Sequence, residues 1–309
     1  MAVDVQSISK SFGSLRAVED LSFTVPNGVV TGFLGPNGAG KSTAMRLMLG
    51  LDHGEGRTLF DDRPLTDHPH CSSVVGTHLD ARPFLPGRTA RDHLRMIASD
   101  RQLPKSRIDE ALELVGLTEV AGKRPKGFSL GMAQRLGLAG AVLADPSTLM
   151  LDEPANGLDP QSIQWLRQFL KHYASQGKAV LVSSHLLSEM QMMADQIIVI
   201  AKGKLIAAGT VDDLLAQRSD VLVRCSDPRA LQQKLTDVSS QLEGDDGLSV
   251  TGASTDQIGQ AAYDAGLVVR ELAVRRASLE DTFFALTGDE QQFAFQPVQD
   301  SASTQGGAQ

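Results

Sequence analysis

The 309-residue sequence is poor in cysteine, in positive charge and in long hydrophobic runs. Its two cysteines, Cys71 and Cys225, lie in unrelated segments, so we expect no disulfide framework and a reducing environment. The 29 basic residues are outnumbered by 37 acidic ones, and the net charge of −8 disfavours non-specific binding to nucleic acid. No apolar stretch approaches the roughly 18–20 residues of a membrane helix, and residues 1–6 carry no signal pattern. We therefore expect a soluble, cytoplasmic protein that needs a partner to act at a membrane.

Strand and helix patterns alternate over residues 1–217, which we expect to form one domain. Apolar runs predict strands at residues 3–8, 21–25, 29–34, 148–151, 179–183 and 197–201, and helices at 160–175 and 186–193. Three further helices are predicted within a subdomain of about 86–145, at 89–99, 105–115 and 131–144. Such alternation predicts a mostly parallel sheet with crossover helices, interrupted by the helical subdomain.

A second, smaller α/β unit is expected at residues 218–288. Its predicted segments are 221–225, 228–242, 248–250, 255–265, 268–275 and 278–287. It shows no catalytic constellation, so we interpret it as an accessory or dimer-stabilising domain. Residues 289–309 offer little to bury, and we expect them to be disordered.

A complete phosphate-binding loop follows the predicted strand at 29–34 and precedes a predicted helix. It consists of Gly35, Pro36, Asn37, Gly38, Ala39, Gly40, Lys41, Ser42 and Thr43, and meets the pattern G-x-x-x-x-G-K-[ST]. The glycines let backbone N–H groups converge on an anion, and the helix points its positive end at the same place. Lys41 adds a full charge and Ser42 offers a hydroxyl to Mg²⁺. The sequence therefore predicts binding of a nucleoside triphosphate.

Two carboxylates, Asp152 and Glu153, end the apolar strand at 148–151. Such a strand is buried on both faces, so its end emerges at the carboxyl edge of the sheet, where ligands bind. There Asp152 is expected to hold Mg²⁺ beside Ser42, and Glu153 to orient and deprotonate the attacking water. The alternative is a solvated acidic turn.

Three weaker signals accompany these motifs. Ser129 and Gly131 open the helix at 131–144 and form a second helix start suited to an anion, although a simple N-cap is the alternative. His185 follows the strand at 179–183, from which a histidine can reach a γ-phosphate, although a surface histidine is the alternative. Phe12 offers a flat face for stacking adenine, although phenylalanine is more often a core residue.

Together these motifs resemble the ATP-binding subunit of an ABC transporter, in the family's order and over about residues 2–217. The resemblance implies the ABC ATPase fold of P-loop NTPases, with N-terminal antiparallel strands, a mostly parallel core and a helical subdomain. It implies ATP and Mg²⁺ as cofactors, Glu153 and His185 as catalytic residues, and Ser129, Gly131 and Met132 in the signature motif. It also places Asp159 in the D-loop and Val18 against the base and ribose.

Two positions depart from the family pattern. The signature usually reads Leu-Ser-Gly-Gly-Gln, whereas this chain has Phe128-Ser129-Leu130-Gly131-Met132. The Q-loop glutamine is replaced by Asp80, which is shorter and acidic; it could still approach Mg²⁺ or water. Both departures resemble the drug- and bacitracin-efflux branch, as does the segment 278–288.

The resemblance implies a motor subunit that drives a separate membrane permease, in which two copies close head to tail around ATP. It implies a location on the cytoplasmic face of the membrane, and the branch suggests export of drugs or antibiotics. A soluble ABC ATPase acting on ribosomes or DNA is the alternative, disfavoured by the single phosphate loop and the negative charge. An inactive regulatory subunit is disfavoured because Lys41, Asp152, Glu153 and His185 are all present. A zinc site from His68, His70, Cys71 and His78 lacks a second Cys/His pair to complete it.

Overall fold

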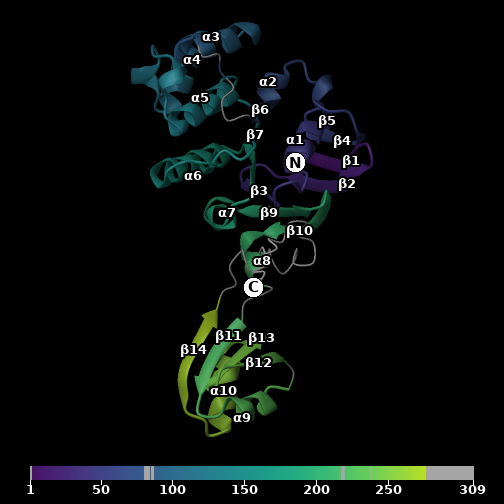
Figure 1. Ribbon diagram of the computed structural model, residues 1–309, viewed down its shortest axis with the longest axis vertical. Coiled ribbons are helices and arrows are strands. Elements are labelled where there is room, and N and C mark those ends of the chain that lie inside the picture. The colour runs from purple at the N-terminus through teal and green to yellow at the C-terminus, as the bar shows by residue number, and fades with distance from the viewer. Residues whose placement is uncertain (1, 80–83, 85–86, 217–219, 237, 276–309) are drawn as a thin grey trace, which may run out of the picture.

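The computed structural model describes residues 2–79, 84, 87–216, 220–236 and 238–275. Asp80, the predicted helix at 278–287 and the expected tail at 289–309 lie outside the described residues. Figure 1 shows the helical subdomain, the sheets of the first domain and the C-terminal unit along the long axis of the molecule.

A six-stranded sheet with the order β10-β9-β3-β8-β7-β6 forms the centre of the first domain. Its strands are β3 (Val30–Leu34), β6 (Val75–His78), β7 (Thr148–Leu151), β8 (Ala179–Ser184), β9 (Gln196–Ala201) and β10 (Lys204–Thr210). All neighbours pair in parallel except β9 and β10. Every residue of β3, β7 and β8 is buried, as expected for parallel strands covered on both faces. The predicted parallel core is confirmed, although β6 and β10 were not predicted.

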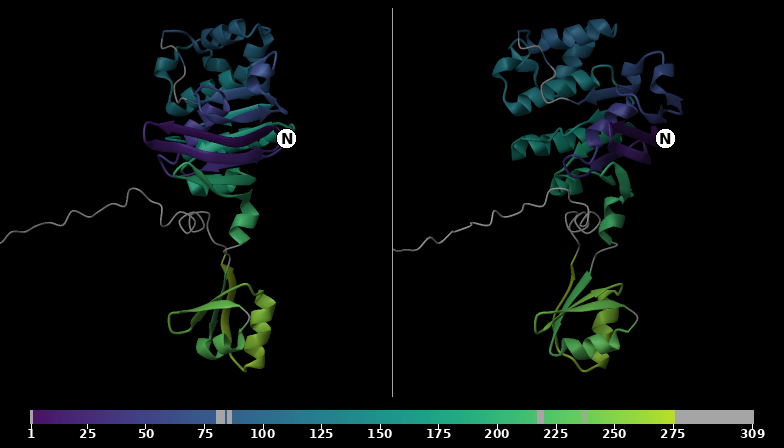
Figure 2. Two further views of the ribbon diagram at one scale, coloured as in Figure 1. Left: turned by 90° about the vertical axis from the view of Figure 1, so that its right-hand side faces the viewer. Right: turned by 45° about the vertical axis from the view of Figure 1, so that its right-hand side comes forward.

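An antiparallel sheet with the order β2-β1-β4-β5 packs beside this core. Its strands are β1 (Val3–Phe12), β2 (Leu15–Val25), β4 (Glu55–Phe60) and β5 (Arg63–Pro64). The first two strands extend beyond the predicted 3–8 and 21–25 and form one long hairpin, which runs lengthwise across the domain in the left view of Figure 2. Phe12 and Leu15 pair at the tip of this hairpin.

Three helices form the helical subdomain: α3 (Ala90–Asp100), α4 (Ser106–Leu114) and α5 (Leu130–Val142). Thr89 caps α3 by accepting the backbone N–H of Asp92, and Ser129 caps α5 in the same way. The remaining helices of the domain are α1 (Lys41–Met48), α2 (Cys71–Val74), α6 (Pro160–Ser175), α7 (Leu187–Met193) and α8 (Val211–Ala216).

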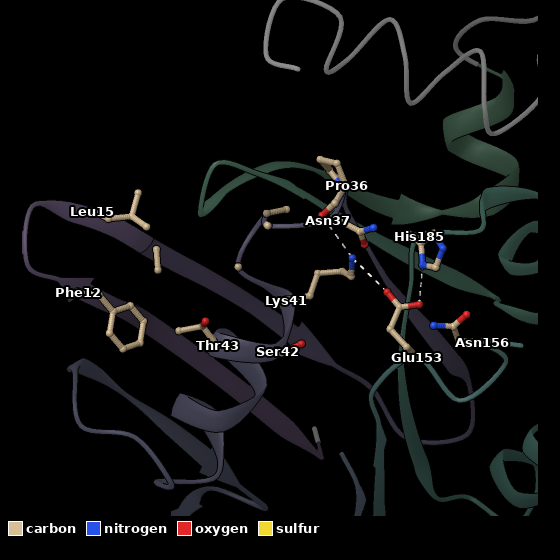
Figure 3. Close-up of a pocket in the computed structure, with 14 residues that line it drawn as sticks. Phe12, Leu15, Pro36, Asn37, Lys41, Ser42, Thr43, Glu153, Asn156 and His185 are labelled. Carbon is tan, nitrogen blue, oxygen red and sulfur yellow. Dashed lines mark hydrogen bonds and ion pairs between the residues drawn. The ribbon is translucent and has the colours of Figure 1, made fainter. Parts of the chain in front are cut away.

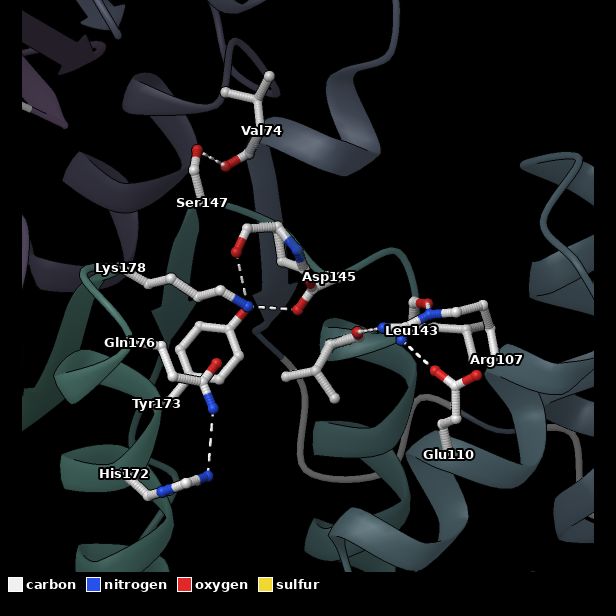
Figure 4. A network of polar contacts seen from close by, with 12 residues as sticks. Val74, Arg107, Glu110, Leu143, Asp145, Ser147, His172, Tyr173, Gln176 and Lys178 are labelled. Atoms are coloured by element: carbon white, nitrogen blue, oxygen red, sulfur yellow. Dashed lines mark hydrogen bonds and ion pairs between the residues drawn. The ribbon is translucent and has the colours of Figure 1, made fainter.

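The connection from α5 to β7 is held by polar contacts from both sides (Figure 4). From α4, Arg107 Nε donates to the carbonyl of Leu143 at 3.1 Å. From α6, the hydroxyl of Tyr173 donates to the carbonyl of Pro146 at 2.7 Å. Lys178 forms an ion pair with Asp145 and lies 4.4 Å from the centre of the Tyr173 ring. These contacts fix where β7 begins, and therefore where the carboxylates at its end lie.

The C-terminal unit has the order strand–helix–strand–strand–helix–strand, a split β-α-β arrangement. Its elements are β11 (Asp220–Cys225), α9 (Pro228–Lys234), β12 (Ser239–Glu243), β13 (Gly247–Thr251), α10 (Thr255–Asp264) and β14 (Val269–Arg275). The strands form an antiparallel sheet in the order β12-β13-β11-β14. The predicted segment 228–242 is divided between α9 and β12. Val221, Val223 and Cys225 share a core with Leu231 of α9 and Ile258 of α10, so both helices cover one face of the sheet.

No helix among the described residues combines the length and apolar character needed to cross a bilayer.

Candidate functional site

The phosphate loop occupies the turn between β3 and α1, which begins at Lys41. Gly40 has a φ of 100°, and Gly38 has a φ of 82°. A Cβ atom at Gly40 would also collide with the carbonyl oxygen of Ala17. Glycine is therefore required at residue 40 both by backbone conformation and by the close approach of β2.

A cleft of about 550 Å³ opens above this loop. Figure 3 shows side chains from three regions around it: the hairpin tip, the phosphate loop with the start of α1, and the ends of β7 and β8. The lining residues are Phe12, Leu15, Ala17, Pro36, Asn37, Gly38, Ala39, Gly40, Lys41, Ser42, Thr43, Glu153, Asn156 and His185. The fold thus brings the predicted loop, Phe12, Glu153 and His185 to one cleft. Leu15, Ala17 and Asn156 were not predicted; the first two follow Phe12 around the hairpin.

Glu153 lies between Lys41 and His185 (Figure 3). Its Oε1 atom is 3.3 Å from Lys41 Nζ, and its Oε2 atom is 2.8 Å from His185 Nδ1. Lys41 is 6% exposed and also donates to the carbonyl oxygen of Gly35 at 2.7 Å. A carboxylate held in this way beside a phosphate loop can accept a proton from water, while the lysine faces the loop's anion site.

The backbone at Glu153 adopts a left-handed conformation, with a φ of 48°. This conformation costs a residue other than glycine about 1–3 kcal/mol and is concentrated at functional sites. Ser183, at the end of β8, holds both carboxylate residues: its Oγ accepts the backbone N–H of Glu153 at 2.9 Å and donates to Asp152 Oδ1. Ser183 was not predicted as a site residue, although it lies at a strand end two residues before His185.

The oxygen donors Ser42 and Asp152 suit Mg²⁺, which is usually bound by one or two protein ligands together with water and phosphate oxygens. Ser42 lines the cleft, and Asp152 lies at the adjacent strand end, where Ser183 fixes one carboxylate oxygen. The described residues include no group of three or more His, Cys, Asp or Glu side chains suited to a metal ion. The residues considered for zinc have separate partners: His68 Nε2 contacts the carbonyl oxygen of Phe60 at 2.8 Å, whereas His78 contacts Gln134.

Phe12 and Val18 occupy different environments. Phe12 is 53% exposed at the edge of the cleft, where a flat ligand can reach its ring. Val18 is fully buried in the core beneath the hairpin and does not line the cleft. The alternation of β2 turns Ala17 toward the cleft and Val18 into the core, and the contact of Val18 with base and ribose stays a prediction.

The signature residues lie away from the cleft. Ser129 caps α5, with its Oγ accepting the backbone N–H of Met132 at 3.2 Å, and Gly131 packs against Ser162 of α6. The side chain of Asp159 caps α6 by accepting the backbone N–H of Ser162 at 2.8 Å, a bond that holds the pKa of Asp159 below its ordinary value. Ser129, Gly131, Met132 and Asp159 are all absent from the lining of the cleft. These four residues therefore complete no phosphate site within one copy of the described structure.

Glu189, on α7, is a further carboxylate near the catalytic pair. Burial raises its pKa; the charge of Glu153 adds to this rise, and His185 opposes it. Its Oε2 atom is buried without a hydrogen-bond partner among the described residues. Glu189 was not singled out from the sequence.

Comparison with known proteins identifies the family of the chain. Residues 18–156 match the model of the ABC transporter family, and residues 219–280 match a domain of unknown function. The chain is 36% identical over 298 residues to the uncharacterized ABC transporter ATP-binding protein YhcH of Bacillus subtilis, covering 93% of this chain and 96% of that protein. It is 32% identical over 297 residues to the bacitracin transport ATP-binding protein BcrA of Bacillus licheniformis, covering 93% and 97%.

Solved structures agree with this assignment. A structure of the ATP-binding subunit of an ABC transporter superposes with a TM-score of 0.63 and 25% identity, covering 84% of this chain and 98% of that one. The P-loop fold and the predicted family are thus confirmed. The chain belongs to the ATP-binding proteins of ABC transporters, and it is an ATPase.

Proposed function

We propose that the chain is the motor of an exporter and drives a separate membrane permease that carries amphipathic antibiotics or related compounds. The observation that carries the motor function is the arrangement of Lys41, Glu153 and His185 in one cleft above the phosphate loop. The export of antibiotics is supported by relatives named as bacitracin and lantibiotic transport ATP-binding proteins. The chain would then work at the cytoplasmic face of the membrane through the permease, without nucleic acid.

Within the cleft, each residue has a distinct chemical role. The phosphate loop and Lys41 bind the triphosphate, and Phe12 stacks on the adenine. Ser42 and Asp152 hold Mg²⁺, which neutralises phosphate charge when bound. Glu153 accepts the proton of the attacking water, and His185 orients Glu153 through Nδ1 and contacts the γ-phosphate.

The hydrolytic site is completed by a second copy of the chain. Ser129 and Gly131 stand at the N-terminus of α5, a helix start suited to an anion, but outside the cleft of their own copy. A closed twofold pair places this helix start over the triphosphate held by the other copy. The γ-phosphate then stabilises the closed pair, hydrolysis removes those contacts, and the pair reopens. Dimeric ABC cassettes among the solved structures have the same fold, with a TM-score of 0.62 at 20% identity.

The test combines affinity capture with a resistance assay. The tagged Glu153→Gln protein is captured with ATP in mild detergent from its native membranes, with the Lys41→Ala protein as a matched control. We expect one polytopic membrane protein in stoichiometric amount, and a lowered tolerance to bacitracin or a lantibiotic when the chain is deleted. Capture of ribosomal or DNA-repair proteins, together with absence from membranes, would overturn the transport function in favour of the alternative class.

A further inference from the structure

His78 and Gln134 form a buried pair that joins the end of β6 to the middle of α5. They are 2% and 4% exposed, and His78 Nε2 is hydrogen-bonded to Gln134 Oε1. Figure 1 shows α5 beside β6 at the lower edge of the helical subdomain, and the two elements are in direct contact. A buried hydrogen bond of this kind is strongly directional, because loss of its donor would leave the side-chain oxygen of Gln134 unsatisfied.

The imidazole of His78 packs directly against α5 at Gly137. A Cβ atom at Gly137, one helical turn after Gln134, would collide with the ring of His78. The ring therefore lies directly on the helix backbone, where only glycine leaves room for it. The position of α5 over β6 is thus fixed both by a hydrogen bond and by shape.

The main chain of His78 is bonded to the catalytic strand. His78 lies opposite Leu151 in the parallel pairing of β6 with β7, and its carbonyl oxygen accepts the backbone N–H of Asp152 at 2.9 Å. Asp152 and Glu153 are in turn held by Ser183 from β8. One residue therefore contacts the strand end that carries the hydrolytic carboxylates and the helix that begins at Ser129.

We infer that His78 is a positioning residue that fixes the signature helix relative to the carboxylates of β7. In the closed dimer, one chain contributes its carboxylates to its own cleft and Ser129 to the cleft of the other copy. The His78–Gln134 hydrogen bond therefore aligns Ser129 and the carboxylates, which act at two different nucleotides. Loss of the bond lets α5 occupy a range of orientations, and closure of the pair must then select one of them. The inference rests on the proposed ATP-closed dimer.

The experiment measures ATP-driven dimerisation of the full chain in the Glu153→Gln background by sedimentation, and ATP affinity of the monomer by fluorescence titration. His78→Leu removes the donor at similar volume, and we expect the dimer to dissociate about tenfold more readily, since a buried acceptor is left unpaired. Monomer affinity for ATP should change by less than about twofold, because neither His78 nor Gln134 lines the cleft. His78→Gln, whose amide can reach Gln134 Oε1, should restore most of the dimerisation.

Two further variants distinguish loss of the hydrogen bond from a general loss of stability. Gln134→Met removes the same bond from the other side, and the double variant with His78→Leu should be no worse than either single variant. His93→Leu is the matched control, because His93 is 4% exposed and lies on α3 of the same subdomain. This substitution should lower stability without changing dimerisation.

The possible results separate the two proposals. Equal dimerisation of the parent and the folded His78→Leu protein would overturn the inference alone, as would an equal loss in His93→Leu. Failure of the Glu153→Gln parent to dimerise with ATP would overturn the proposed closed dimer, and the inference with it.

Discussion

The catalytic cleft and the signature segment belong to one domain but are held in different ways. The cleft is formed where β3, β7 and β8 end side by side, and its side chains contact one another directly: Glu153 contacts both Lys41 and His185. The signature segment stands at the start of α5, in a subdomain joined to the sheet through the His78–Gln134 pair and the contacts around Asp145. Parallel pairing fixes strand ends relative to one another, whereas a packed helix keeps freedom to tilt.

The two halves of the proposed site should therefore respond differently to mutation. Changes in the cleft should alter chemistry or nucleotide affinity in a single copy. Changes at the signature segment should leave nucleotide affinity intact and act only where two copies meet.

The largest effect is expected for Glu153→Gln. Loss of the proton acceptor should lower kcat by about 10²–10⁴-fold while ATP affinity stays within a few fold. Steady-state phosphate release and equilibrium binding measure the two quantities, with Glu113→Gln on the exposed face of α4 as a control for loss of one carboxylate. Near-normal turnover by the variant would remove Glu153 as the base.

Ser129→Ala should impair the contact between two copies and leave the cleft of each copy intact. We expect ATP-driven dimerisation and kcat to fall by about tenfold or more, with unchanged ATP affinity of the monomer. The substitution also removes a helix cap, which costs about 1 kcal/mol of stability.

Thr89→Ala is the matched control for that loss, because Thr89 caps α3 in the same subdomain and its Oγ1 accepts the backbone N–H of Asp92 at 3.1 Å. It should lower the melting temperature to a similar extent and leave turnover unchanged. A similar loss of turnover in both variants would mean that Ser129 acts only as a cap.

Phe12→Ala tests the hairpin side of the cleft. Loss of aromatic stacking should weaken ATP binding by about 5–150-fold, since base–aromatic stacking contributes about 1–3 kcal/mol. Leu15→Ala, at the same hairpin tip, is the control for lost apolar surface. Titration of both variants with ATP and with inorganic triphosphate sharpens the test, because only the nucleoside-dependent part of the affinity should change in Phe12→Ala.

The smallest effect is expected for Glu189→Gln, and it depends on pH. Burial raises the pKa of Glu189 above 4.5, so the folded state binds its proton more tightly than the unfolded state does. The stability contributed by this group is present below pH 4.5 and is lost as pH rises through the raised pKa. Thermal unfolding should therefore show that Glu189→Gln raises the melting temperature by about 1–2 °C at pH 8 and leaves it unchanged at pH 4. The reverse dependence on pH would contradict the assigned direction.

Much of the first domain could be predicted because its strongest patterns are local. The strands β3, β7 and β8 are continuous apolar runs, and α6 has regular helical spacing with Pro160 at its first turn. β6 and β10 were missed because Val75–His78 and Lys204–Thr210 contain Gly, Thr, Lys and His, and their strand conformation depends on pairing with β7 and β9. The strands of the long β1–β2 hairpin were predicted too short for a similar reason, since the residues near its tip are largely exposed and polar.

From the sequence alone one can identify the phosphate loop, the carboxylate pair after β7 and His185, because each lies in a short segment whose residue types and spacing meet a local backbone requirement. Which of these residues contact one another depends on the tertiary fold. It directed Ala17 rather than Val18 to the cleft, bonded Ser183 to the backbone of Glu153 and the carboxylate of Asp152, and set His78 against Gly137 of α5. The contact of Ser183 with Asp152, 31 residues away, follows from strand order, and that of His78 with Gly137, 59 residues away, follows from helix packing. No local sequence pattern predicts either contact.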